Sequence, residues 1–148
     1  MVHLTYPVVR KVEPWLIYAV FSLLMYGLWG FFPKMATENG IEPRSILIYE
    51  AIGTLGVVLI VLAFAGFRPE FNGKGFTFAL IAGTAGAIGS LLFLFALSKG
   101  KVSVVVTMTA LYPLIVIILS FLVLKEPLTI KQGIGIVFAV AAVVLFSL

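Results

Sequence analysis

The sequence predicts an all-α integral membrane protein with five transmembrane helices. Of its 148 residues, 62% are hydrophobic and only 11% are charged, and the mean hydropathy is +1.21. A soluble domain carries roughly 25% charged residues, so lipid is needed to cover this much apolar surface. The apolar runs are close to the roughly 20 residues that a helix needs to cross the hydrocarbon core of a bilayer. They are apolar on all faces, whereas the strands of a membrane barrel alternate in polarity, so helices are predicted rather than strands.

The five predicted helices fill the chain as one domain. We place them at about residues 14–39, 43–67, 75–99, 102–124 and 129–148. Pro43 suits the first turn of a helix, where a missing N–H costs no hydrogen bond. Gly40 and Gly100 follow the first and third helices, where a left-handed cap is expected. Thr129 and Gln132 have the spacing of a capping box at the start of the fifth helix. The loops are short, so successive helices are predicted to be antiparallel neighbours.

Small residues and a proline mark the third and fourth helices. Gly83 and Gly86 belong to rows of small residues spaced four apart, which let helix backbones approach closely in lipid. We therefore expect these glycines to have a structural packing role, with direct substrate contact as the alternative. Pro113 lies near the middle of the fourth helix and predicts a kink there. Thr107 and Tyr112 lie close to the kink and are candidate substrate or coupling-ion residues.

The sequence shows no sign of an enzyme. It has no Cys, its one His is His3, and it contains no nucleophile–base set, phosphate-binding loop or metal-ligand cluster. The net charge of +4 comes without a basic run that would favour nucleic acid. We predict no cofactor, no metal and no nucleic-acid partner. The predicted partners are membrane lipid, a second copy of the chain and a small-molecule substrate of unknown identity.

Glu50 is the one charged residue between Ser45 and Phe67. It has two interpretations. An ion pair with Lys99 or Lys34, whose stems reach toward the membrane interface, would tether the second helix structurally. Alternatively, the carboxylate exchanges a proton or binds a cationic substrate, because ionisable groups inside membranes are often functional.

Aromatic and polar residues of other helices are predicted at the same depth as Glu50. Trp29 lies near the end of the first helix, and Lys99 ends the third. Tyr26 and Trp29 are either interface anchors, which aromatic residues near helix ends often are, or part of a cavity lining. Ser103 and Thr107 lie in the first part of the fourth helix on the same side, so Glu50, Trp29, Lys99, Ser103 and Thr107 share one level if their faces converge. The candidate substrate or coupling-ion residues are Glu50, Trp29, Tyr26, Thr107 and Tyr112.

Three segments carry a family resemblance. "YGLWGFFPK" (residues 26–34), "FALSKGKVSVVVTMTALYP" (95–113) and "LKEPLTIKQGIGIVF" (124–138) resemble EamA-type members of the drug/metabolite transporter superfamily. The resemblance implies one five-helix repeat of a ten-helix transporter bundle, and a structural role for Glu126 at a helix end. Family members often have an Arg early in the second helix, where this sequence has Glu50. Substrate inferences that depend on that Arg therefore do not carry over.

The resemblance implies a multi-pass protein of the cell (plasma or inner) membrane that exports or transports a small metabolite by alternating access. Family transporters carry two inverted repeats, so a single repeat is expected to work as a homodimer, with antiparallel insertion as one form. Lys and Arg are nearly balanced between the two sides, which dual insertion requires. One side carries Arg10, Lys11, Arg68, Lys74, Lys125 and Lys131, and the other carries Lys34, Arg44, Lys99 and Lys101. The alternatives are a flippase of a lipid-linked substrate and a non-transporting membrane subunit.

Overall fold

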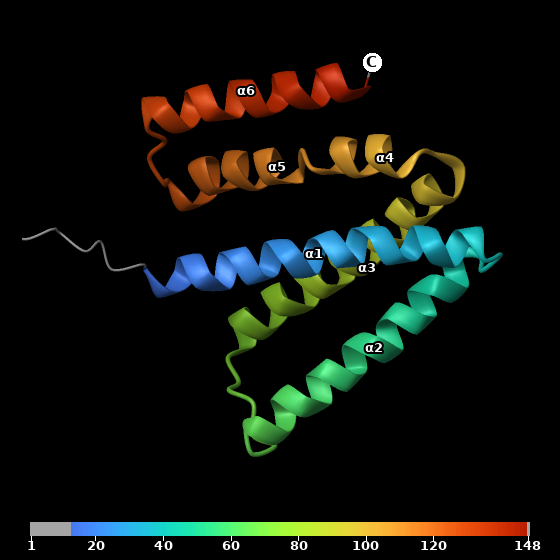
Figure 1. Ribbon diagram of the computed structural model, residues 1–148. Helices are drawn as coiled ribbons and strands as arrows, with labels where there is room; N and C mark the ends of the chain where they lie inside the picture. Colours follow the sequence, from blue (N-terminus) through green and yellow to red (C-terminus); the bar gives the residue numbers. More distant parts are fainter. Residues whose placement is uncertain (1–12, 148) are drawn as a thin grey trace, which may run out of the picture.

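The computed structural model describes residues 13–147, and all regular structure in that range is helical (Figure 1). The elements are α1 (Pro14–Glu38), α2 (Pro43–Phe64), α3 (Gly73–Lys99), α4 (Val102–Thr109), α5 (Tyr112–Leu119), the π-helical turn η1 (Ser120–Leu124) and α6 (Ile130–Ser147). Four segments are long and apolar enough to cross a membrane: α1, α2, α3 and the combined segment Val102–Leu124. The apolar part of α6 is shorter, at Ile130–Phe146. The all-α membrane fold is thus confirmed, with four candidate spans and a fifth, shorter helix.

The helix ends follow the sequence signals at most positions. Gly40 follows α1 with a φ of 83°, the left-handed conformation predicted for it. The Thr129–Gln132 capping box is formed, because Gln132 N donates to Thr129 Oγ1 at 3.3 Å and Thr129 N donates to Gln132 Oε1 at 2.8 Å. The left-handed cap predicted at Gly100 is wrong, since its φ is −111° and its ψ 168°.

Glycine is required at position 100 because a side chain would not fit there, and not because the backbone adopts a left-handed conformation. A Cβ at this position would lie 2.8 Å from Val105 Cγ2 and 3.2 Å from the carbonyl oxygen of Ala96. The tight passage from α3 into α4 leaves no room for a side chain.

The fourth predicted helix is broken near its middle. α4 ends at Thr109 and α5 begins at Tyr112, with Pro113 in its first turn. Proline has no N–H for the helical ladder, and its ring clashes with the carbonyl four residues earlier. The Thr109 hydroxyl bonds locally instead, donating to the carbonyl oxygens of Val105 and Val106 at 3.0 Å each. The interruption therefore lies where Pro113 predicts a kink.

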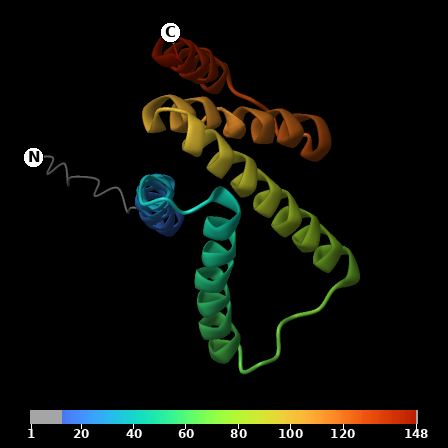
Figure 2. The same ribbon diagram turned by 90° about the vertical axis from the view of Figure 1, so that its right-hand side faces the viewer.

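The packed core lies at one end of the bundle. There the end of α1, the start of α2, the end of α3 and the start of α4 come together. α2 and α3 diverge from this end toward the loop that joins them (Figure 2). The buried residues are Gly30 and Pro33 of α1, Ile46 of α2, and Phe93, Leu94 and Leu97 of α3. Elsewhere the large apolar side chains are mostly exposed, as expected for a surface in contact with lipid.

Lys34 ties the ends of α1 and α3 together. Its Nζ donates to the carbonyl oxygens of Leu97 at 3.1 Å and Gly100 at 3.3 Å, and lies 4.0 Å from Glu38 Oε1. The last carbonyls of a helix have no partner within the helix, and the helix dipole favours a cation beside them. Lys34 thus caps α3 from a neighbouring helix.

Substituting Lys34 by Met is expected to destabilise this junction. Hydrogen bonds from charged groups contribute about 1.5–3 kcal/mol, and partial exposure should reduce the loss to about 1–2 kcal/mol. Thermal unfolding of the detergent-purified protein measures the change. Lys99→Met is the matched control. Lys99 lies in the last turn of α3, the helix end that Lys34 caps, but its side chain is exposed. Equal losses in the two variants would contradict the capping role of Lys34.

Candidate functional site

Glu50 lies between α2 and α3, and its two carboxylate oxygens have different surroundings. Ser90 Oγ of α3 donates to Glu50 Oε2 at 2.7 Å. Glu50 Oε1 is buried, and no donor within residues 13–147 reaches it. A buried polar atom without a partner costs about 1–3 kcal/mol, and more if it is charged. The site therefore holds a hydrogen-bond acceptor that the fold itself does not satisfy.

Trp29 of α1 lies across from Glu50 and is held by an aromatic contact. Its indole stacks on Phe93 of α3 with ring centroids 5.2 Å apart and an interplanar angle of 18°. Phe93 is buried, whereas Trp29 remains 42% exposed. One ring face is thus anchored to the core while the rest of the indole remains available to a ligand.

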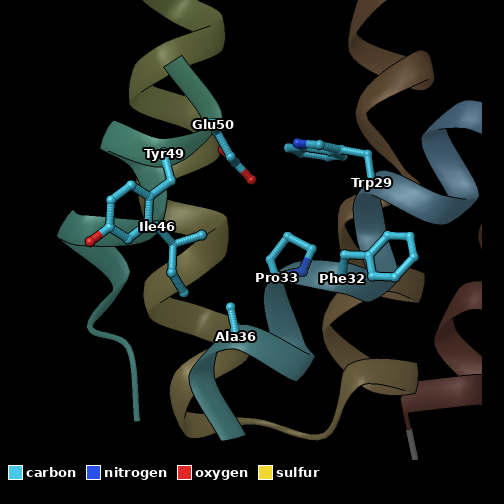
Figure 3. A pocket seen from close by; sticks show the side chains of 7 residues that line it. All are labelled: Trp29, Phe32, Pro33, Ala36, Ile46, Tyr49 and Glu50. Carbon is cyan, nitrogen blue, oxygen red and sulfur yellow. The ribbon is translucent and has the colours of Figure 1, made fainter. Parts of the chain in front are cut away.

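Two cavities meet at Glu50 and Trp29. The first, of about 300 Å³, lies between α1 and α2, and Figure 3 shows Glu50 and Trp29 facing each other across it. It is lined by Trp29, Phe32, Pro33, Ala36, Ile46, Tyr49 and Glu50. The second, of about 580 Å³, lies mainly between α2 and α3. It is lined by Trp29, Leu47, Glu50, Ala51, Thr54, Leu55, Val58, Gly83, Gly86, Ala87 and Ser90. Glu50 and Trp29 are the two residues that line both cavities.

The charge of both cavities comes from Glu50. All other lining residues are apolar, aromatic or neutral polar, and none is Lys or Arg. Among the described residues, a phosphate or carboxylate group in these cavities would therefore meet a carboxylate and no balancing cation.

Pro33 interrupts the hydrogen bonding of α1 beside the first cavity. Because proline has no N–H, the carbonyl of Trp29, four residues earlier, loses its usual helical donor. Pro33 is buried and lines the same cavity as Trp29. The lining of the site thus combines a carboxylate with an aromatic surface.

One of the two interpretations of Glu50, an ion pair with Lys99 or Lys34, is not formed in the described residues, where the ion pair is Lys34–Glu38. Lys34 is directed to the carbonyl groups at the end of α3 instead, and the side chain of Lys99 is exposed. The carboxyl ends of helices attract cations, so the end of α3 competes with Glu50 for Lys34.

Three of the candidate site residues, Tyr26, Thr107 and Tyr112, do not line the cavities that contain Glu50. Tyr26 and Tyr112 are 66% and 61% exposed, and neither lines a cavity described above. Thr107 Oγ1 donates to the carbonyl oxygen of Ser103 at 2.6 Å, within its own helix. Of these candidates, Trp29 lines the cavities together with Glu50, whereas Thr107, Tyr26 and Tyr112 do not.

The predicted close packing at Gly83 and Gly86 is absent within this chain. A Cβ at either glycine would meet nothing within 4 Å, and both glycines line the second cavity. α2 and α3 diverge along their length (Figure 2), and a cavity lined by residues of both helices lies beside these glycines.

Ser90 and Phe93 are partners of the candidate site that were not predicted from the sequence. Ser90 has the same spacing as Gly86 and Ala82, which would have indicated the helix face that it shares with the glycines. Phe93 has no distinguishing sequence signal, because aromatic residues are frequent throughout these helices.

Glu126 belongs to a different place in the fold. Its backbone N–H donates to the carbonyl oxygen of Ser120 at 3.3 Å, between η1 and α6. Together with Phe121 and Gln132 it lines a third cavity of about 420 Å³. The structural role at a helix end stays a prediction for this residue.

The chain was compared with known proteins. The model of the EamA-like transporter family matches residues 13–148. An uncharacterised protein of Methanocaldococcus jannaschii is 34% identical over 135 residues, which cover 90% of this chain and 96% of that protein. No solved structure matches. The family match spans nearly the whole chain and agrees with the apolar helices, so this membrane protein belongs to the EamA-like transporter family.

Proposed function

We propose that the protein is a secondary transporter that moves a small metabolite across the cell membrane by alternating access. The observation that carries the proposal is Glu50, a carboxylate on a membrane-spanning helix with one unsatisfied oxygen at the junction of two cavities. Ionisable residues inside a membrane are costly and typically belong to substrate or ion pathways. The absence of a Glu50–lysine pair in the described residues favours this role over a structural tether.

We further propose that two chains form the transport unit. In one chain, α1, α2 and α3 supply the walls of both cavities, and Trp29 is still 42% exposed. Alternating access needs two bodies that move against each other around a site. A second chain facing the cavities would provide the other body and enclose the substrate.

Antiparallel insertion of the two chains is compatible with the charge distribution. The α2–α3 connection and the start of α6 lie at the end of the molecule where α1 begins, and the α1–α2 and α3–α4 connections lie at the other end (Figure 1). The helix ends and connections of the first group carry Arg68, Lys74, Lys125 and Lys131, and those of the second carry Lys34, Arg44, Lys99 and Lys101. These are four on each side, while Arg10 and Lys11 lie outside the described residues. Reporters of inside and outside location fused to the C-terminus test this, and a single orientation would exclude the antiparallel dimer.

The opening between α2 and α3 bears on the alternative of a lipid flippase. A lateral opening would admit a lipid-linked substrate from the membrane. A lipid-linked substrate that contains a phosphate group needs a cation to balance its charge, however. Neither cavity has a basic lining residue among the described residues. The charge of the site thus favours a small metabolite over a phosphate-bearing lipid.

Counterflow in liposomes tests transport directly. The purified protein is reconstituted, loaded with candidate amino acids, nucleosides or organic cations, and tested for uptake of the same labelled compound. We expect uptake above that of empty liposomes for at least one class, and its loss in Glu50→Gln. Ligand binding without counterflow in any class would instead support a non-transporting membrane subunit.

A further inference from the structure

We propose that the cavities at Glu50 and Trp29 bind a small organic monocation: a protonated amine that carries an apolar or aromatic body and no carboxylate or phosphate. The proposal rests on the transporter function proposed above and names its substrate class. It depends on three properties of the site: its charge, its unsatisfied acceptor Glu50 Oε1 and its aromatic lining.

The negative charge of the site favours a positively charged ligand. Glu50 is the charged lining residue of both cavities, and the nearest lysine of α1, Lys34, is engaged with the carbonyls of Leu97 and Gly100. An anion would face the carboxylate without a counter-charge. A zwitterionic amino acid would satisfy Glu50 with its ammonium group but leave its own carboxylate without a cation. A monocation avoids both costs, because it is attracted by the Glu50 carboxylate and carries no negative group that needs a partner.

The unsatisfied acceptor matches the donors of an ammonium group. Glu50 Oε1 is buried without a donor, while Oε2 is already bonded by Ser90. Glu50 lines both cavities, so a rotation of its side chain would bring Oε1 to a ligand in either one. An ammonium group has several N–H donors and can bond to this oxygen.

The aromatic lining matches an apolar body and favours a cation. Trp29, Phe32 and Tyr49 line the first cavity. Figure 3 shows the indole ring of Trp29 extending toward Glu50, while the rings of Phe32 and Tyr49 point away from it. The faces of aromatic rings attract cations, and Trp does so most strongly. Stacking on Phe93 holds the indole in place, so little freedom is lost when a ligand binds.

The experiment compares four ligands of similar size and different charge. Phenethylamine is the cation, phenethyl alcohol the neutral analogue, hydrocinnamate the anion and phenylalanine the zwitterion. Binding to the detergent-purified full chain is measured by calorimetry, with empty micelles as the blank for partitioning into detergent. We expect phenethylamine to bind at least about tenfold more tightly than each of the other three, the difference that one charged hydrogen bond supplies.

Glu50→Gln is expected to lower the affinity for phenethylamine by at least about tenfold and to leave phenethyl alcohol nearly unchanged. Glu42→Gln is the matched control, because Glu42 is an exposed carboxylate at the start of the same helix without a side-chain capping bond. It should leave both affinities unchanged. An equal effect of the two substitutions would show long-range attraction instead of a site and would overturn the proposal.

The ligand series decides the proposal even if Glu50→Gln fails to fold. Equal or tighter binding of the alcohol, the acid or the amino acid to the unmodified protein would overturn it. Failure of this inference is separable from failure of the transport proposal. Selective amine binding without counterflow would refute transport alone, whereas counterflow of another class without amine selectivity would refute the cation site alone.

Discussion

Gly86→Leu is expected to abolish transport while leaving the fold intact. Gly86 lies on α3 one turn before Ser90, and it lines the cavity of about 580 Å³ that leads to Glu50. A Cβ there would meet nothing within 4 Å, so a leucine can be accommodated by the single chain. Its side chain would fill the space next to Glu50 that the proposed substrate has to pass. We expect counterflow and phenethylamine binding to fall by at least about tenfold, with a melting temperature close to that of the unmodified protein.

Gly89→Leu is the control for this substitution. Gly89 is on the same helix and also has nothing within 4 Å of an added Cβ, but it lines neither cavity. Both substitutions replace glycine by a better helix former, so their effects on helix stability are matched. Normal counterflow in Gly86→Leu would show that the space beside α3 is not part of the pathway. Equal loss in both variants would indicate a general defect of α3.

Leu94→Ala is expected to cause the largest loss of stability among the substitutions considered. Leu94 and Leu97 of α3 are completely buried, in the core where α1, α2 and α4 meet α3. Lipid is as apolar as a protein interior, so the transfer of the side chain contributes little in a membrane. The cavity and the lost packing contacts remain, and they lower the free energy of unfolding by about 2–3 kcal/mol.

The matched control is Leu92→Ala, because Leu92 is two residues away on α3 and 63% exposed. It should change the free energy of unfolding by no more than about 0.5 kcal/mol. Unfolding of the purified proteins in mild detergent with increasing denaturant measures both. A loss in Leu92→Ala as large as that in Leu94→Ala would mean that the core does not lie at this end of the bundle.

Much of the local structure was predictable from the sequence, because it depends on interactions between residues close in the chain. The capping box of Thr129 and Gln132 forms over three residues, and the left-handed Gly40 follows from its place after α1. The break between α4 and α5 follows from the missing N–H of Pro113. Gly100 is the instructive exception, since its role depends on the approach of Val105 rather than on its own φ.

The candidate site was only partly predictable. Glu50 and Trp29 were both chosen from the sequence, and the structure places them on the same two cavities. Thr107 was chosen from its depth as well, Tyr112 from its place near Pro113 and Tyr26 as an aromatic residue near a helix end, and none of the three lines these cavities. Depth along a helix follows from the 1.5 Å rise per residue. The direction in which a side chain points depends on the rotation of the helix about its axis.

The sequence by itself determined that this protein is a bundle of apolar membrane helices of the EamA-like family, where those helices start and end, and which one is interrupted. Only the tertiary structure decided that Lys34 caps α3 instead of pairing with Glu50, that Ser90 bonds to Glu50, and that Gly83 and Gly86 line a cavity. The physical reason is that these helices are apolar on every side. A helix in water shows its buried face as a hydrophobic stripe, but a helix covered by lipid has no such stripe to reveal its rotation.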